Sequence, residues 1–173
     1  MKRFSYSICA SLVLLASFLA FSKLSASAAP KPLAKASAIQ VLMIQSDEIK
    51  LPAEFQISLY ENLIKELEKK GGFQHVYREG DSAAASAPDL LTLHSTVRGF
   101  KEGSERARQV TTVAGATSIN VHCQFTGKDG ATLLESDIKG KVRFFGANLK
   151  ATYDFAKKAA KIAHDSFSGK AGA

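Results

Sequence analysis

Apolar residues recur along this chain with two different spacings, and each spacing predicts a different kind of secondary structure. Residues 38–44 are a short apolar run of mostly branched side chains, which is typical of a buried strand. After Pro52, apolar residues return at i, i+3, i+4 and i+7, which indicates a helix with one buried face. The members of this stripe are Tyr60, Leu63, Ile64 and Leu67. The residues expected on the solvent side of the helix are Glu61, Lys65, Glu66, Glu68 and Lys69.

Period-two alternation predicts the strands that follow. Residues 73–77 can form a short strand, and residues 89–100 and 119–125 alternate as strands with one buried face do. The sequence Gly-Lys-Asp-Gly at 127–130 predicts a hairpin turn into a return strand. The inward residues of the return strand are expected to be Leu134, Ile138, Val142 and Phe144. Its outward residues are expected to be Glu135, Asp137, Lys139, Lys141 and Arg143.

A second amphipathic helix is predicted over residues 148–168. Its apolar stripe is spaced by steps of three and four residues. The members of that stripe are Leu149, Tyr153, Ala156, Ala160, Ala163 and Phe167. The element order therefore predicts an α+β fold with two layers, in which a mostly antiparallel sheet of four or five strands carries two helices on one face.

The first 28 residues have the order of a secretory signal peptide. Lys2 and Arg3 precede an apolar run at 8–21, and small residues before and at Ala28 fit a cleavage site there. The apolar run of about 14 residues is shorter than the roughly 20 of a membrane span. The cleavage point holds no Cys, so a lipoprotein is not expected. A cleaved signal predicts a periplasmic or secreted protein, and a retained signal anchor is the alternative.

Behind this segment we expect a flexible linker at 29–37, one domain at 38–168 and a disordered tail at 169–173. The 173 residues are 46% hydrophobic and 23% charged, which excludes disordered and fibrous chains. The net charge of +7 falls to +4 on cleavage, because three basic residues and no acid leave with the signal. Cys9 leaves too, so Cys123 has no partner for an internal disulfide and is expected to be a core residue.

Two histidines and two acids are expected on the polar face of the sheet. Depending on which two residues form the turn, His122 faces either Glu135 or Asp137 on the return strand, and His94 lies on the neighbouring strand. An ordinary cross-strand pair is the simpler interpretation, and an acid–base or metal site is the alternative. The histidines lack the i, i+4 spacing of a helical metal site. We therefore assign no catalytic residue, no metal and no cofactor.

The segment 101–115 is polar and charged, and it is predicted to be a long exposed hairpin loop. We expect Gly103, Arg106 and Arg108 in this loop to contact a protein partner. A basic row on the return strand could face an anionic membrane surface. Nucleic acid is not an expected partner, because no aromatic side chain lies among these outward bases to stack on. The members of the basic row are Lys139, Lys141 and Arg143.

A series of segments in the second half of the chain is familiar. It consists of 99–108 (GFKEGSERAR), 114–121 (AGATSINV), the turn 127–130 and Leu-Leu-Glu at 133–135. The series resembles a bacterial envelope family known as domain of unknown function 4410, over about residues 38–167. The resemblance implies an α+β domain similar to those of envelope lipoproteins that build secretion and outer-membrane assemblies, with no established activity. Two departures are the missing lipobox Cys and Thr126, where the family usually has an acid.

These observations favour an exported, non-enzymatic domain of the cell envelope that binds a protein partner or takes part in envelope assembly. One alternative is a hydrolase or metal-dependent enzyme that uses His94, His122 and Glu135. A second alternative is a module that binds anionic lipid or glycan through its basic face. The sequence names neither the partner nor the oligomeric state.

Overall fold

The computed structural model describes residue 33 and residues 35–46, 48–110, 115–142 and 147–168. The chain divides into residues 1–31 and residues 32–173, and every described residue lies in the second unit. The predicted signal peptide, its cleavage site after Ala28 and the tail at 169–173 lie outside the described residues and stay predictions. Within the described ranges, no helix is long and apolar enough to cross a membrane.

Five strands form one mixed sheet in the order β2-β1-β3-β4-β5. β1 runs parallel to both of its neighbours, and the longer strands β3, β4 and β5 are antiparallel to one another. The α+β class and the mostly antiparallel sheet are thereby confirmed. The strands are β1 (Ala38–Val41), β2 (His75–Arg78), β3 (Leu90–Lys101), β4 (Thr117–Thr126) and β5 (Thr132–Val142).

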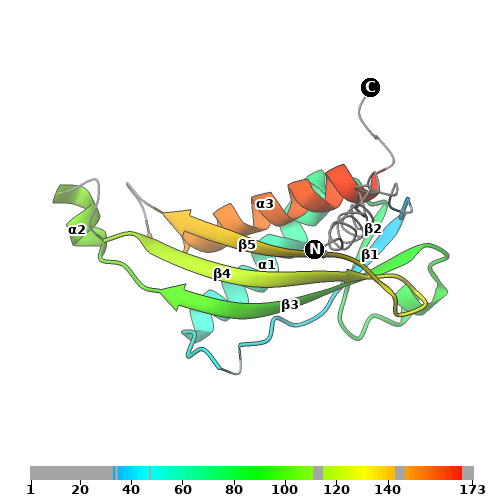
Figure 1. Ribbon diagram of the computed structural model, residues 1–173, viewed down its shortest axis with the longest axis horizontal. Coiled ribbons are helices and arrows are strands. Elements are labelled where there is room, and N and C mark those ends of the chain that lie inside the picture. Colours follow the sequence, from blue (N-terminus) through cyan, green and yellow to red (C-terminus); the bar gives the residue numbers. More distant parts are fainter. Residues whose placement is uncertain (1–32, 34, 47, 111–114, 143–146, 169–173) are drawn as a thin grey trace, which may run out of the picture. The chain divides into compact units, whose positions relative to one another are not determined.

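The two long helices, α1 (Ala53–Lys70) and α3 (Lys150–Phe167), pack side by side on one face of the sheet (Figure 1). The small side chains of α3 let it approach the sheet closely. At Gly140 on β5, a Cβ atom would lie 2.1 Å from the Ala151 carbonyl oxygen. The core between the layers contains the inward residues of β3, β4 and β5 and the apolar stripes of both helices. This is the predicted two-layer arrangement.

Two helix residues were predicted on the wrong side, one of them as exposed and the other as buried. Glu66 was expected on the solvent side of α1, but only 1% of it is exposed. Tyr153 was expected in the core, but it is 43% exposed, and Phe155 is buried in its place. The predicted stripe widens because α1 and α3 pack against each other as well as against the sheet. Each helix therefore buries more than one face.

The domain begins before β1. Ala36 is buried, and its N–H donates to the Phe167 carbonyl at 3.2 Å. The Ser37 carbonyl accepts a hydrogen bond from the N–H of Gln74 at 2.8 Å. The last residues of the predicted linker are therefore held by the fold.

Short helices lie inside two segments that were predicted to be loops. The 3-10 helix η1 (Ser82–Ser86) begins after Asp81, whose side chain accepts a hydrogen bond from the N–H of Ala83 at 2.9 Å. The helix α2 (Glu105–Val110) lies between β3 and β4 (Figure 1). The prediction of a hairpin connection is correct, but residues 105–110 form a helix rather than an exposed loop.

The outer edge of β5 is covered in part by side chains of α3. The Lys141 N–H donates to Asp154 Oδ2 at 2.9 Å, and Lys158 Nζ donates to the Lys139 carbonyl at 2.8 Å. An edge strand normally offers such groups to another strand. Because α3 occupies them, this part of the edge is closed to strand addition.

Candidate functional site

The polar face of the sheet brings His122 and Asp137 together. The strands β4 and β5 place these residues opposite each other, and His122 Nδ1 lies 3.0 Å from Asp137 Oδ1. Of the two registers that the sequence left open, the one with Asp137 is correct. The turn itself is longer than two residues, and a register shift beyond Phe125 absorbs the difference.

Glu135 and His94 belong to a neighbouring row of the sheet. Both face Gln124 from opposite sides, and Gln124 Nε2 donates to Glu135 Oε1 at 2.7 Å. The four predicted residues are therefore split between two rows. Among the residues that the structure describes, no three His, Cys, Asp or Glu side chains converge as metal ligands would. The His122–Asp137 contact has the geometry of an ordinary cross-strand pair.

Cys123 lies on the inward face of β4 and is fully buried. Its Sγ is 3.8 Å from Ser95 Oγ. Burial raises the pKa of the thiol to about 12, so it stays protonated at neutral pH. A protonated, enclosed thiol is a poor nucleophile, which agrees with the predicted core role.

The connection between β3 and β4 holds the most elaborate polar network among the described residues. We call residues 103–110 and 115–117 the hairpin tip. Arg108 of α2 is only 3% exposed, and its guanidinium donates to the Gly115 carbonyl, to Thr117 Oγ1 at 3.2 Å and to Asn148 Oδ1 at 2.7 Å. These acceptors come from the segment before β4, from the first residue of β4 and from the residues just before α3. The guanidinium thus joins three parts of the chain at one point.

Asn148 ties the network to the start of the hairpin tip. Its side chain donates to the Gly103 carbonyl at 3.2 Å, and its backbone N–H donates to Glu105 Oε1 at 3.1 Å. The Gly103 N–H donates to Thr117 Oγ1 at 3.0 Å. A Cβ on Gly103 would lie 2.0 Å from the Gly115 carbonyl oxygen, so only glycine fits there.

The predicted contact residues therefore separate into two kinds. Gly103 and Arg108 are built into the base of the hairpin tip, and the expectation that Arg108 is exposed is wrong. Arg106 is exposed as expected. Thr117, Asn148 and Val110 also belong to this region, and no prediction from the sequence placed them at a contact site. The sequence offered one weak signal for each of the first two. Thr117 is a polar residue at an inward strand position, and Asn148 lies shortly before a helix.

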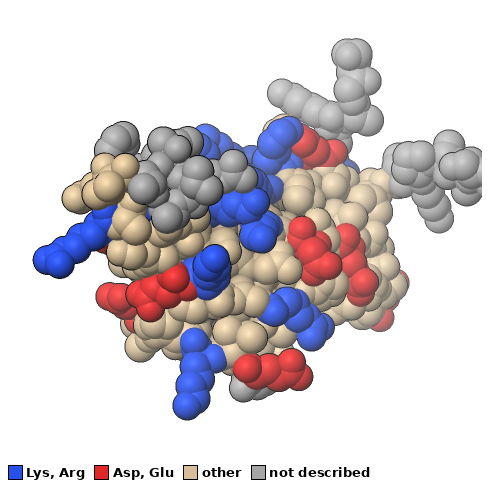
Figure 2. All heavy atoms as spheres, turned by 60° about the vertical axis from the view of Figure 1, so that its left-hand side comes forward, with Lys and Arg blue, Asp and Glu red and all other residues tan. Residues whose placement is uncertain are grey.

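Val110 at the end of α2 is 83% exposed, the highest value among the large apolar residues that the structure describes as exposed. It stands beside polar residues on a helix whose other side is fixed by Arg108. Figure 2, which turns this side of the domain toward the viewer, shows basic and acidic side chains interspersed, with several basic ones gathered near the top. The hairpin tip thus presents one exposed apolar side chain beside exposed Glu105 and Arg106, on a helix held by the hydrogen bonds of Arg108.

No family model matches the chain, and no curated protein matches it. A variant of PelC from Paraburkholderia phytofirmans, solved as a dodecamer, shares the fold with a TM-score of 0.56 at 14% identity, covering 79% of this chain and 94% of that chain. The PelC dodecamer in a second crystal form gives the same TM-score and identity. The hypothetical protein CT253 from Chlamydia trachomatis gives a TM-score of 0.41 at 9% identity, covering 61% of this chain and 71% of that one. Likeness at these identities concerns the fold alone.

Proposed function

We propose that the protein is an exported, non-catalytic domain of the cell envelope that acts by protein assembly, and that its hairpin tip contacts a further copy of the same chain. The observation that carries this proposal is the exposure of Val110 on a helix whose base is fixed by buried hydrogen bonds. An apolar side chain on a rigid support loses little conformational entropy when it docks, which favours association.

Three further observations support the proposal. The solved dodecamers that share the fold are assemblies of PelC. The leader at residues 1–28 has the order of an export signal. The resemblance to domain of unknown function 4410, which we include in the proposal, implies an envelope role without an established activity. Association through the covered part of the β5 edge is disfavoured, because Asp154 and Lys158 occupy its polar groups.

The experiment replaces the apolar contact with a charge and measures the mass of the assembly. We expect the purified wild-type protein to be oligomeric by light scattering. Val110→Asp should raise the dissociation constant of the oligomer at least tenfold. Burial of one charge in an apolar contact is sufficient for an effect of that size. The matched control is Ile57→Asp, because Ile57 is also exposed (64%) but lies on α1.

Two results would contradict this proposal. A monomeric wild-type protein over the whole accessible concentration range would rule out self-assembly. An oligomer that Val110→Asp leaves intact, or that Ile57→Asp disrupts equally, would rule out the hairpin tip as its interface. Circular dichroism of each variant shows whether the fold is retained.

A further inference from the structure

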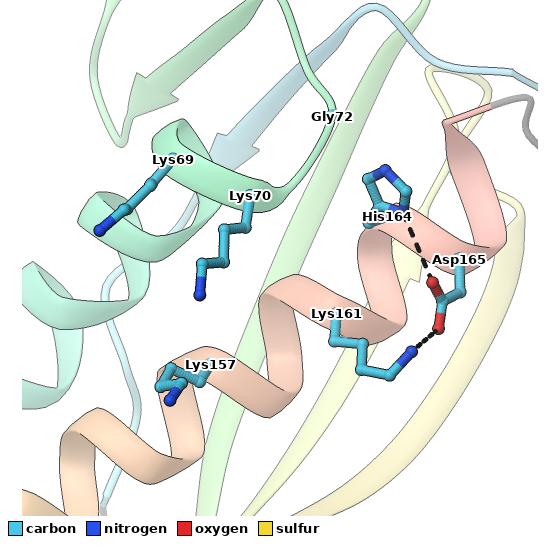
Figure 3. A pocket seen from close by; sticks show the side chains of 7 residues that line it. All are labelled: Lys69, Lys70, Gly72, Lys157, Lys161, His164 and Asp165. Carbon is cyan, nitrogen blue, oxygen red and sulfur yellow. Dashed lines mark hydrogen bonds and ion pairs between the residues drawn. The ribbon is translucent and has the colours of Figure 1, made fainter.

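A cleft of about 600 Å³ lies between the end of α1 and the last turns of α3. Lys69 and Lys70 come from α1, and Lys157, Lys161 and His164 come from α3. Figure 3 shows Lys70 extending toward Lys157, while Lys69 runs back along α1 and Lys161 turns to Asp165. The cleft is lined by Lys69, Lys70, Gly72, Lys157, Lys161, His164 and Asp165. Four of these seven side chains are lysines, so the cleft concentrates positive charge on a domain with a modest overall charge.

The single carboxylate that lines the cleft is already engaged. Asp165 Oδ2 accepts from Lys161 Nζ at 2.6 Å, and Asp165 Oδ1 lies 3.4 Å from His164 Nδ1. The hydrogen bond from Lys161 and, to a smaller extent, that from His164 lower the pKa of Asp165. The Asp165 carboxylate is therefore charged at neutral pH. Asp165 therefore offsets one lysine and leaves three.

The remaining lysines, Lys69, Lys70 and Lys157, have no carboxylate partner within the described part of the chain. Lys69 and Lys70 lie in the last turn of α1, where cations stabilise the negative end of the helix dipole. That account does not extend to Lys157, which lies in the middle of α3 with its ammonium 5.4 Å from the centre of the Tyr153 ring. Its ammonium has a cation–π contact with Tyr153 one turn earlier, and this contact leaves its charge without a carboxylate.

Gly72 fixes the distance between the two walls of the cleft. Its φ is +79°, and a Cβ there would lie 2.9 Å from Ser168 Cβ and 3.1 Å from His164 Cδ2. The chain leaving α1 therefore runs directly against the end of α3. Gly72 thus keeps the end of α1, with Lys69 and Lys70, close to the last turns of α3.

We propose that this cleft binds a phosphate group, either free or as the headgroup of an anionic lipid. Phosphate offers several acceptor oxygens and up to two negative charges, which suits three ammonium groups without a carboxylate partner and a histidine. The site is separate from the hairpin tip. Asn148 lies just before α3 and His164 lies in its last turn, which places them about 24 Å apart at the rise of a helix. This inference therefore does not depend on the proposed assembly.

The test is a titration of the protein purified from cells that express the full chain. Inorganic phosphate, glycerol 1-phosphate and vesicles of phosphatidylglycerol are added in separate arms, with phosphatidylcholine vesicles as the neutral reference. We expect saturable shifts of the amide signals of Gly72 and Lys157. The variant Lys157→Glu should weaken binding at least tenfold, and Lys70→Glu/Lys157→Glu should abolish it. Lys65→Glu, an exposed lysine of α1 outside the cleft, is the charge-matched control and should bind as the wild type does.

Each arm has a defined consequence. Equal affinity for inorganic phosphate and glycerol 1-phosphate, with no gain on vesicles, identifies free phosphate as the ligand. Tighter binding to phosphatidylglycerol vesicles that Lys157→Glu removes identifies a lipid headgroup. Linear, unsaturable shifts overturn the proposal, and so does an equal loss in Lys65→Glu, because both would reflect the general charge of the surface.

Discussion

Positive charge is held in opposite ways in the two regions that flank α3. At the end near the hairpin tip, Arg108 is 3% exposed and donates to a carbonyl, a hydroxyl and an amide oxygen of other segments. At the end near the cleft, Lys69, Lys70 and Lys157 are exposed and have no carboxylate partner among the described residues. The arginine is held by acceptors of the protein itself, and the lysines are the groups that we propose bind a ligand.

This difference follows from the chemistry of the two side chains. The guanidinium of Arg is planar, with fixed donors and weak hydration, so it tolerates burial when its acceptors are preorganised. The ammonium of Lys is compact and strongly hydrated on a flexible stem, so it remains at the surface. A basic residue is therefore informative about ligands only after its burial is known. Arg106 and Arg108, two positions apart in the sequence, illustrate how little the sequence alone distinguishes the two cases.

The largest effect is expected from Arg108→Ala. The change removes the donor for the Gly115 carbonyl and for the buried oxygens of Thr117 and Asn148, and it leaves a cavity. The loss of three hydrogen bonds from a buried charged group, together with the cavity, makes the expected loss in the free energy of unfolding about 3 kcal/mol. Urea unfolding measures it.

The control for that variant is Arg106→Ala, because Arg106 is exposed on the same short helix. Its effect should stay within about 0.5 kcal/mol, as for most surface substitutions. A loss below about 1 kcal/mol for Arg108→Ala, or equal losses for both variants, would contradict the conclusion that Arg108 stabilises the fold and Arg106 does not.

A somewhat smaller effect is expected from Gly103→Ala. The added methyl would lie 2.0 Å from the Gly115 carbonyl oxygen and 2.5 Å from the Ala116 carbonyl carbon, and both of these belong to the backbone. The hairpin tip must shift to admit it, at a cost of about 1–3 kcal/mol. Gly99→Ala is the control, because its nearest contact would be Asn120 Cβ at 3.8 Å. Phosphate binding in the cleft should be unchanged in both variants, and a loss there would show that the two regions are coupled.

The layout of the fold could be predicted from the sequence because local periodicity reports which side of an element is buried. The alternation along β4 correctly placed Val121, Cys123 and Phe125 inward. The partner of His122 could not be predicted, because register depends on which residues form the turn. Moving a two-residue turn by one position along the chain exchanges Glu135 for Asp137 opposite His122.

The base of the hairpin tip was beyond the reach of sequence patterns for a different reason. Arg108 and Asn148 are 40 residues apart, and no periodicity relates a charged segment to the start of a distant helix. The burial of Glu66 could not be predicted for a related reason. It depends on how α1 packs against α3 and not on the pattern along α1 itself. Contacts between elements, and the polar residues that they bury, come from tertiary packing.

The smallest effect is expected from Asp165→Asn, which sharpens the comparison at the cleft. The change removes the one negative charge that lines the cleft and releases Lys161 from its hydrogen bond of 2.6 Å. Phosphate affinity should rise roughly threefold, as expected for the loss of one like charge several ångströms away in water. Isothermal titration measures the change, and Glu48→Gln removes an exposed carboxylate outside the cleft as the control. If affinity instead falls in Asp165→Asn, then the ion pair positions Lys161 and His164 for the ligand, and this end of α3 shares the preorganised design of the hairpin tip.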